Sequence, residues 1–161
     1  MSVAIVFHSE TGNTQGVAQR LASACDGTLI PVKDLEGYSK FTMYLKGSAR
    51  ARRRKLDPIE PSVIDVSGHS VVVIGTPVWA WSPTPAVNAA IAALKGCEGK
   101  KGIVFATCGG KPGETLSMMK EALAAKGVDV VGQFVFVQKE LGDGQKLAEL
   151  VSAVKQAAGM G

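Results

Sequence analysis

The sequence lacks several features that would assign the protein to particular classes. No apolar run approaches the roughly 18 to 20 residues that a transmembrane helix needs. The apolar stretch Val3–Phe7 is not preceded by the basic region, or followed by the cleavage site, of a secretory signal. The three cysteines are an odd number without a CxxC pair, which argues against a disulfide framework or a structural zinc site and suits a reducing compartment. These absences predict a cytoplasmic protein with no membrane insertion and no metal site.

Size and composition favour one globular domain. The chain has 161 residues, of which 46% are hydrophobic and 20% are charged. This apolar content is enough to bury a core and excludes general disorder. We therefore expect a single domain spanning residues 1–161.

The positive charge is concentrated in one short segment. The formal net charge is +4, but six basic residues and one acidic residue lie between Lys46 and Asp57, and the rest of the chain has 12 basic and 13 acidic residues. This basic segment, Lys46–Lys55, is interpreted either as a solvated surface or as a docking patch for an acidic redox partner protein. No aromatic residues alternate with the arginines, so binding to nucleic acid is not expected.

Predicted strands and helices alternate along the chain. The expected helices are Asn13–Ala24, Pro85–Leu94, Thr115–Ala125 and Gln145–Ala158, with Thr84 capping the second. The expected strands are Val3–Phe7, Thr28–Val32, Val71–Ile74, Gly102–Thr107 and Val128–Val137. The pattern predicts an α/β fold with a doubly wound, five-stranded parallel sheet and helices on both faces. The interval Lys33–Ser67 breaks the alternation, and we expect two short helices there, over Ser39–Leu45 and Ala49–Leu56.

The first strand-to-helix loop has the composition of a phosphate-binding site. Ser9, Thr11 and Thr14 offer hydroxyl donors, Gly12 lets the backbone approach a ligand, and the first amides of the following helix have no partners within it. Because no Lys or Arg lies within the loop, it suits a terminal monophosphate held by hydroxyls and amides. The alternative is an ordinary helix cap, which the same residue types would also provide.

The segment Ser9-Glu10-Thr11-Gly12-Asn13-Thr14 resembles the phosphate-binding signature of the flavodoxins, and the likeness extends over nearly the whole chain. This resemblance implies a flavodoxin-like sheet with strand order 2-1-3-4-5 and FMN as the cofactor. It also implies that the side chains and amides of Ser9 to Thr14, including the Glu10 amide, bind the 5′-phosphate of FMN. The remaining contacts are then expected in the loops that follow the third and fourth strands.

The loop after the third strand contains both tryptophans of the chain. An indole can stack on the flavin ring, and the resemblance places an aromatic side chain of this loop against the flavin. The residues expected near the ring are Thr76, Pro77, Val78, Trp79, Ala80 and Trp81, with Trp79 preferred over Trp81 as the stacking residue. The alternative is that both tryptophans pack on the protein's own surface.

The loop after the fourth strand is rich in glycine, so its amides can approach the carbonyl edge of the flavin. The expected contacts are Thr107, Cys108, Gly109, Gly110 and Gly113. The alternative for these glycines is simple turn formation before a helix. Cys108 is interpreted as a packing residue, since no histidine is near it in the sequence to activate it. No catalytic acid, base or nucleophile is expected.

Two departures from the flavodoxin pattern bear on function. No aromatic residue lies between Thr107 and Glu114 to cover the outer face of the flavin, and no glycine lies between Thr76 and Thr84. Without a glycine in this loop, a residue with a Cβ, such as Ala80 or a neighbour, would have to adopt any positive φ angle there, at a steric cost.

We predict an FMN-binding electron carrier of the flavodoxin type, with an FMN-dependent NAD(P)H or quinone reductase of the same fold as the alternative. A flavin-free interaction domain is the third possibility.

Overall fold

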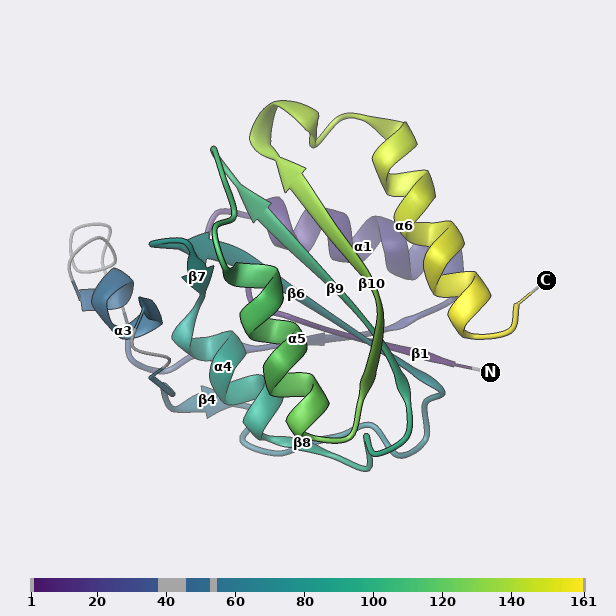
Figure 1. The fold of residues 1–161 in the computed structure, drawn as a ribbon, viewed down its shortest axis with the longest axis horizontal. Helices are drawn as coiled ribbons and strands as arrows, with labels where there is room; N and C mark the ends of the chain where they lie inside the picture. The colour runs from purple at the N-terminus through teal and green to yellow at the C-terminus, as the bar shows by residue number, and fades with distance from the viewer. Residues whose placement is uncertain (1, 38–45, 53–54, 161) are drawn as a thin grey trace.

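Five parallel strands form the central sheet of the computed structural model, which describes residues 2–37, 46–52 and 55–160 (Figure 1). The spatial order of the strands is β10–β9–β6–β1–β2, which is the predicted order 2-1-3-4-5. The bounds are β1 Val3–Phe7, β2 Thr28–Pro31, β6 Val71–Trp79, β9 Lys101–Cys108 and β10 Asp129–Val137. The predicted fold class is therefore confirmed.

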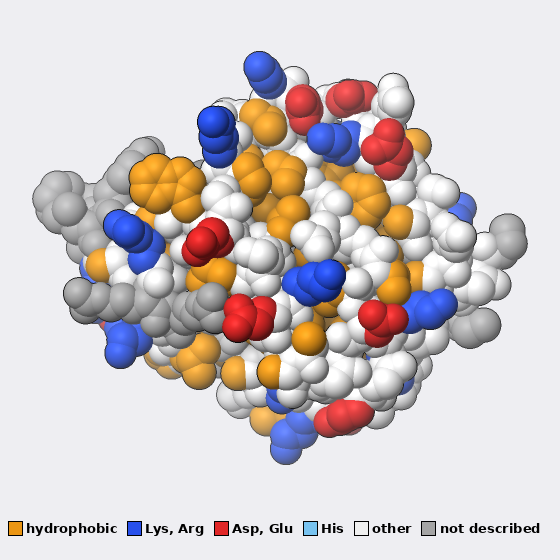
Figure 2. Space-filling model, viewed as in Figure 1, with side chains coloured by type: hydrophobic (Ala, Val, Ile, Leu, Met, Phe, Trp, Pro, Cys, Tyr) orange, Lys and Arg blue, Asp and Glu red, His pale blue; other side chains and the backbone are white. Residues whose placement is uncertain are grey.

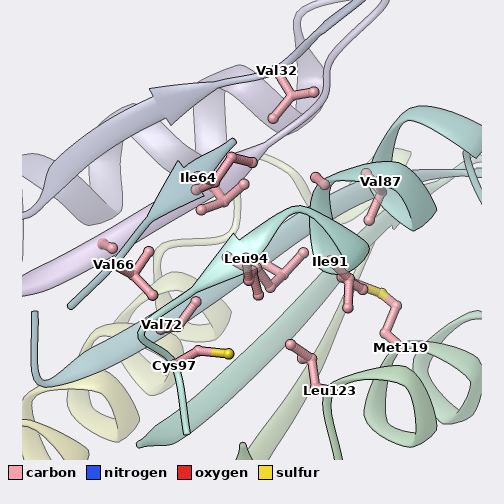
Figure 3. Close-up of a cluster of buried hydrophobic side chains, with 14 of the residues drawn as sticks. Val32, Ile64, Val66, Val72, Val87, Ile91, Leu94, Cys97, Met119 and Leu123 are labelled. Carbon is pink, nitrogen blue, oxygen red and sulfur yellow. The ribbon is translucent and has the colours of Figure 1, made fainter. Parts of the chain in front are cut away.

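Helices cover both faces of the sheet because the side chains of each strand alternate between the two faces. Val3, Ile5 and Phe7 of β1 pack with residues of α1 (Asn13–Cys25) and α6 (Gly144–Ala157). Ala4 and Val6 of the same strand pack on the other face with α4 (Pro85–Ala92) and α5 (Thr115–Ala125). Figure 3 shows this second cluster, in which Met119 of α5 lies close to Ile91 of α4. Burial on both faces explains why the central strands are continuously apolar.

The strand β6 continues five residues beyond the predicted end at Ile74. It reaches Trp79 because the chain then turns back and pairs with β7 (Ser82–Pro83) in a short antiparallel hairpin. Within β6, a Cβ at Gly75 would lie 2.2 Å from the Phe105 ring, so glycine makes room for that ring in the core. The predicted cap of α4 is confirmed, since the Thr84 side chain accepts a hydrogen bond from the Val87 amide.

The interval between β2 and β6 forms small peripheral elements. β3 (Lys33–Asp34) pairs with β4 (Ile59–Glu60), and β5 (Ile64–Asp65) pairs with β8 (Leu94–Lys95). The pairing of Leu94 explains why α4 ends at Ala92 and not, as predicted, at Leu94. The predicted helix Ser39–Leu45 lies outside the described residues. The helix predicted over Ala49–Leu56 is wrong at its C-terminal end: α3 is Ser48–Arg52, residues 53–54 are not described, and the chain from Lys55 to Pro58 is not helical.

A single turn of 3₁₀ helix, η2 (Gln138–Glu140), links β10 to α6. Among the helices that the structure describes, none is long and apolar enough to cross a membrane.

Candidate functional site

The loops that follow β1, β6 and β9 meet at one edge of the sheet and enclose a pocket of about 330 Å³. They meet because the three strands are neighbours and parallel, so their carboxyl ends lie together. The pocket is lined by Glu10, Thr11, Asn13, Ser48, Pro77, Val78, Trp79, Ala80, Thr107, Cys108 and Gly109. The structure thus brings together ten of the site residues that the sequence predicted. Ser48 was not predicted, because the sequence gives no sign that α3 reaches this edge.

The first loop presents amide groups at the start of α1. Gly12, at the N-cap position of the helix, adopts a left-handed conformation (φ 93°). The Ser9 hydroxyl accepts hydrogen bonds from the amides of Gly12 and Gln15, both at 3.2 Å, and can still donate its own hydrogen. A Cβ at Gly12 would have no atom within 4 Å, so there is open space beside the loop. Thr14 lies beneath the loop, where its hydroxyl and that of Thr107 are 2.8 Å apart.

The second loop is a tight turn built from residues that disfavour it. Val78 pairs with Pro83 and Trp79 with Ser82, which leaves only Ala80 and Trp81 to make the turn. Both have positive φ angles, 50° and 62°, as a two-residue hairpin of this type requires. The loop therefore adopts positive φ angles although it contains no glycine. The loop holds strain that the surrounding contacts must offset.

The two tryptophans occupy different environments. Trp79 is 8% exposed, lines the pocket, and meets the edge of the His8 ring at a centroid distance of 5.9 Å. Trp81 is 60% exposed and lies outside the pocket lining. Thr76 is also not among the residues that line the pocket. Its hydroxyl donates to the Pro77 carbonyl and accepts from the Thr84 amide.

Some residues of the third loop line the pocket, and others pack against the second loop. Thr107, Cys108 and Gly109 line the pocket, whereas Gly110 faces a neighbouring groove. A Cβ at Gly113 would lie 2.3 Å from that of Trp81, so this glycine lets the two loops touch. Burial raises the pKa of the Cys108 thiol, and its sulfur lies 3.4 Å from the Gly110 carbonyl oxygen. Both observations agree with a packing role.

His8 lies beside the site, although it is not among the residues that line the pocket. The residue is 2% exposed, and its ring links two loops: Nδ1 lies 2.9 Å from the Thr84 hydroxyl and Nε2 lies 2.8 Å from a Glu10 carboxylate oxygen. These contacts give His8 a structural role directly after the buried strand β1 and next to the phosphate loop.

A second polar cluster lies near His8. The buried Asp57 carboxylate receives a hydrogen bond of 2.7 Å from Arg50 Nε, which ties α3 to the chain before β4. Burial and the neighbouring Asp57 carboxylate raise the pKa of Asp34 to about 6. Asp34 Oδ1 accepts a hydrogen bond from the Glu36 amide.

This donor set fits a flat ring that carries a phosphate. The first amides of α1 and a hydroxyl-rich loop border one end of the pocket, and an apolar wall that includes Trp79 borders the rest. Apart from Glu10, the described residues that line the pocket bear no formal charge, so hydrogen bonds and not cations would hold the phosphate.

Comparisons with known proteins find flavoproteins and FMN reductases. The protein-family model described as NADPH-dependent FMN reductase matches residues 1–159. A flavoprotein from Lactobacillus acidophilus NCFM, solved in complex with FMN, has a TM-score of 0.72 and 22% identity, over 87% of this chain and 95% of that one. The two-electron reduced flavodoxin of Megasphaera elsdenii has a TM-score of 0.63 and 21% identity, over 96% and 98% of the two chains. An NADH:FMN oxidoreductase in its apo form has a TM-score of 0.65 and 16% identity, over 98% and 88%. No curated protein sequence matches the chain.

Proposed function

The chain belongs to the family of NADPH-dependent FMN reductases, and from this premise we propose that it is an FMN-containing oxidoreductase that accepts electrons from a reduced nicotinamide nucleotide. FMN is its cofactor and supplies the redox chemistry, while the chain binds, orients and electrostatically tunes it. The phosphate lies at the loop Ser9–Thr14, and the ring lies between the tryptophan loop and the third loop. This choice reverses the preference for a carrier that the sequence alone favoured.

One observation carries the choice of a reductase: an open groove adjoins the pocket at the third loop. The groove has a volume of about 700 Å³ and shares Gly109 with the pocket. It contains Lys111 and Lys139, both exposed, together with Glu140, which is paired with Lys146 at 3.3 Å. Because the third loop has no aromatic side chain, a second molecule can approach the ring from this side. The two lysines would attract the phosphates of a nicotinamide nucleotide.

The residues around the ring have defined tasks in this proposal. Trp79 provides a rigid wall, since its ring is buried and held edge-on by His8. Thr107, Cys108 and Gly109 approach the opposite edge of the ring, and the apolar side chains of Pro77 and Val78 exclude water. No side chain of the chain itself needs to act as an acid, base or nucleophile.

Anaerobic mixing of the FMN-loaded protein with NADPH or NADH tests the proposal. We expect the flavin absorbance near 450 nm to bleach in one phase, at a rate that saturates with nucleotide concentration. If neither nucleotide bleaches the flavin while dithionite does, the protein is not a nicotinamide-dependent reductase.

A second candidate function is electron transfer between proteins, and the basic segment Lys46–Lys55 favours it as a docking surface for an acidic redox partner. Arg52 and Lys55 are exposed there, whereas Arg50 is bonded to Asp57 and Lys46 to Glu36. Figure 2 shows that cationic and anionic side chains are interspersed over the rest of the visible face.

Two measurements test this second candidate. A carrier would be reduced by dithionite in two separate one-electron stages. Charge reversal at Arg52 and Lys55 would slow the reduction of its partner in a salt-dependent way.

A further inference from the structure

We propose that a groove beside Trp81 binds a small aromatic acid, that is, a flat ring that carries a carboxylate. This Trp81 groove has a volume of about 410 Å³, and Ala80 lines both the groove and the FMN pocket, so the hairpin turn forms the boundary between them. The inference goes beyond the proposed function, because it assigns a second ligand to a second site. The described residues that line the groove include Arg52, Ala80, Trp81, Gly113, Glu114 and Met118.

The first argument is the Trp81 ring, which is held at a fixed place and presented to solvent. The residue is 60% exposed, yet its carbonyl accepts a hydrogen bond of 3.1 Å from the Glu114 amide and its Cβ packs against Gly113. Glycine or asparagine would make this turn at a lower cost, and so exposed a ring adds little to the core. Strained residues that their surroundings hold in place are typical of ligand-binding positions, and an indole offers a flat face on which another ring can stack.

The second argument is the cation that shares the groove with this ring. Helix α3 contacts β7, which brings the exposed Arg52 to the same groove as Trp81 (Figure 1). None of the ion pairs among the described residues involves Arg52, whereas Arg50 on the same helix is paired with Asp57. A guanidinium donates two parallel hydrogen bonds to a carboxylate. The indole face and the guanidinium together therefore match a ring that bears an acidic group.

The charges around the groove favour an anion over a cation. Glu114 is exposed in the lining and would repel a carboxylate. Arg52, however, belongs to the basic segment Lys46–Lys55, which has six basic residues and no acidic one, and Lys55 is also exposed. The local charge is therefore positive in spite of Glu114, which limits the affinity for an acid without reversing the preference.

The groove is also distinct from the place proposed for the nicotinamide nucleotide. That nucleotide is expected at the other end of the third loop, where Lys111 and Lys139 would attract its phosphates. The Trp81 groove lies at the Gly113 end of this loop, and its lining includes the sulfur-containing side chain of Met118, a residue that is 6% exposed. A thioether makes favourable contacts with aromatic rings, so the occupant we infer is an aromatic acid separate from the nucleotide.

Titration of the isotope-labelled, FMN-loaded protein with naphthoate, followed through the NMR signals of the indole N–H groups, tests the inference. The chain has two tryptophans, so the Trp81 signal is the one missing from Trp81→Asn, in which asparagine tolerates the positive φ angle. We expect the Trp81 signal to shift saturably with a dissociation constant on the order of 1 mM, and the Trp79 signal to move little. Naphthamide, which has the same ring without the charge, should bind about three- to fivefold more weakly, and acetate should not shift the signal.

Two substitutions in the groove should change the affinity for naphthoate in opposite directions, which a merely structural role would not produce. Arg52→Gln should weaken binding about three- to fivefold, because the cation is lost. Glu114→Gln should strengthen it about twofold, because the repulsion is gone. Neither should change the affinity for naphthamide appreciably. Lys120→Gln removes an exposed cation of α5 that does not line the groove, and as the matched control it should behave as the wild type.

The outcomes separate this inference from the proposed function. Equal affinity for naphthoate and naphthamide, or unchanged naphthoate binding by Arg52→Gln, would overturn the inference alone. Displacement of naphthoate by NADP⁺ would also overturn it, since the groove would then belong to the nucleotide. A failure of the protein to take up FMN would overturn the proposed function instead, and binding of naphthoate could still be measured on the apo protein.

Discussion

Ala80 and Trp81 adopt left-handed backbone conformations that their residue types disfavour. Left-handed backbone conformations cost a residue with a Cβ about 1–2 kcal/mol, and glycine or asparagine would fit this turn better. The sequence predicted the cost but not the turn, because the pairing of Trp79 with Ser82 is a tertiary feature. Strain of this kind persists where the surrounding contacts hold it in place, here the contact of Gly113 with Trp81.

Ala80→Gly should therefore stabilise the protein. Glycine removes the steric cost at φ 50°, and we expect the free energy of unfolding to rise by about 1 kcal/mol in urea titrations. Ala148→Gly, an exposed change within α6, is the control and should lower it by roughly 0.5–1 kcal/mol. A loss of stability in Ala80→Gly would show that the turn is not strained.

Asp34 should make the stability of the protein depend on pH. Its pKa is raised from 3.8 to about 6, so the folded state holds this proton more tightly than the unfolded state does. The contribution is complete below about pH 4 and is lost as the pH rises through 6, where the buried carboxylate becomes charged beside Asp57.

Asp34→Asn removes this charge but keeps an oxygen that can accept from the Glu36 amide. Because Asp34 is partly exposed, we expect a gain of about 1–2 kcal/mol at pH 8 and little change at pH 4. Urea unfolding at both values measures the effect. An equal change at the two values would rule out titration of Asp34 as the cause.

At the scale of elements, the central strands and the four long helices could be predicted because each is long and periodic in sequence. Their ends could not, because they depend on pairing partners distant in sequence: Leu94 leaves α4 to pair with β5, and β6 extends to pair with β7. Ser48 of α3 reaches the pocket through the tie between Arg50 and Asp57, a contact that no local pattern reveals. The contact of His8 with Thr84, 76 positions away, is likewise one that no local pattern reveals.

The contact between the second and third loops can be tested at Gly113. A methyl group there would lie 2.3 Å from the Trp81 Cβ, and the backbone has φ +58°. Gly113→Ala should therefore push the loops apart, weaken FMN binding about tenfold and cost about 1–3 kcal/mol of stability. Fluorescence titration with FMN and urea unfolding measure the two effects.

Gly142→Ala is the matched control, because a Cβ at Gly142 meets no atom within 4 Å and the residue does not have a positive φ. It should change neither quantity appreciably. If Gly113→Ala bound FMN as tightly as the control, the packing of the two loops would not shape the pocket.

At the scale of the whole molecule, the sequence was sufficient to predict the fold and the cofactor because one local motif, Ser9–Thr14, occurs after the first of five alternating strands. It did not distinguish a carrier from a reductase. That choice depends on what covers the ring, and the groove beside Gly109 is formed by the loop after β9, the end of β10 and η2. Net charge was a poor guide to the surface charge of the basic segment, since Lys46 and Arg50 are paired with acidic side chains of the protein.

We propose that the three loops form a binding site for FMN that recognises its phosphate. Titration of the apo protein with FMN and, separately, with riboflavin tests it most directly, with flavin fluorescence as the signal. We predict saturation at one FMN per chain, with strong quenching by the adjacent Trp79, and riboflavin binding at least about tenfold weaker because it lacks the charged hydrogen-bond acceptor. The absence of saturable FMN binding, or equal affinity for riboflavin, would contradict the account.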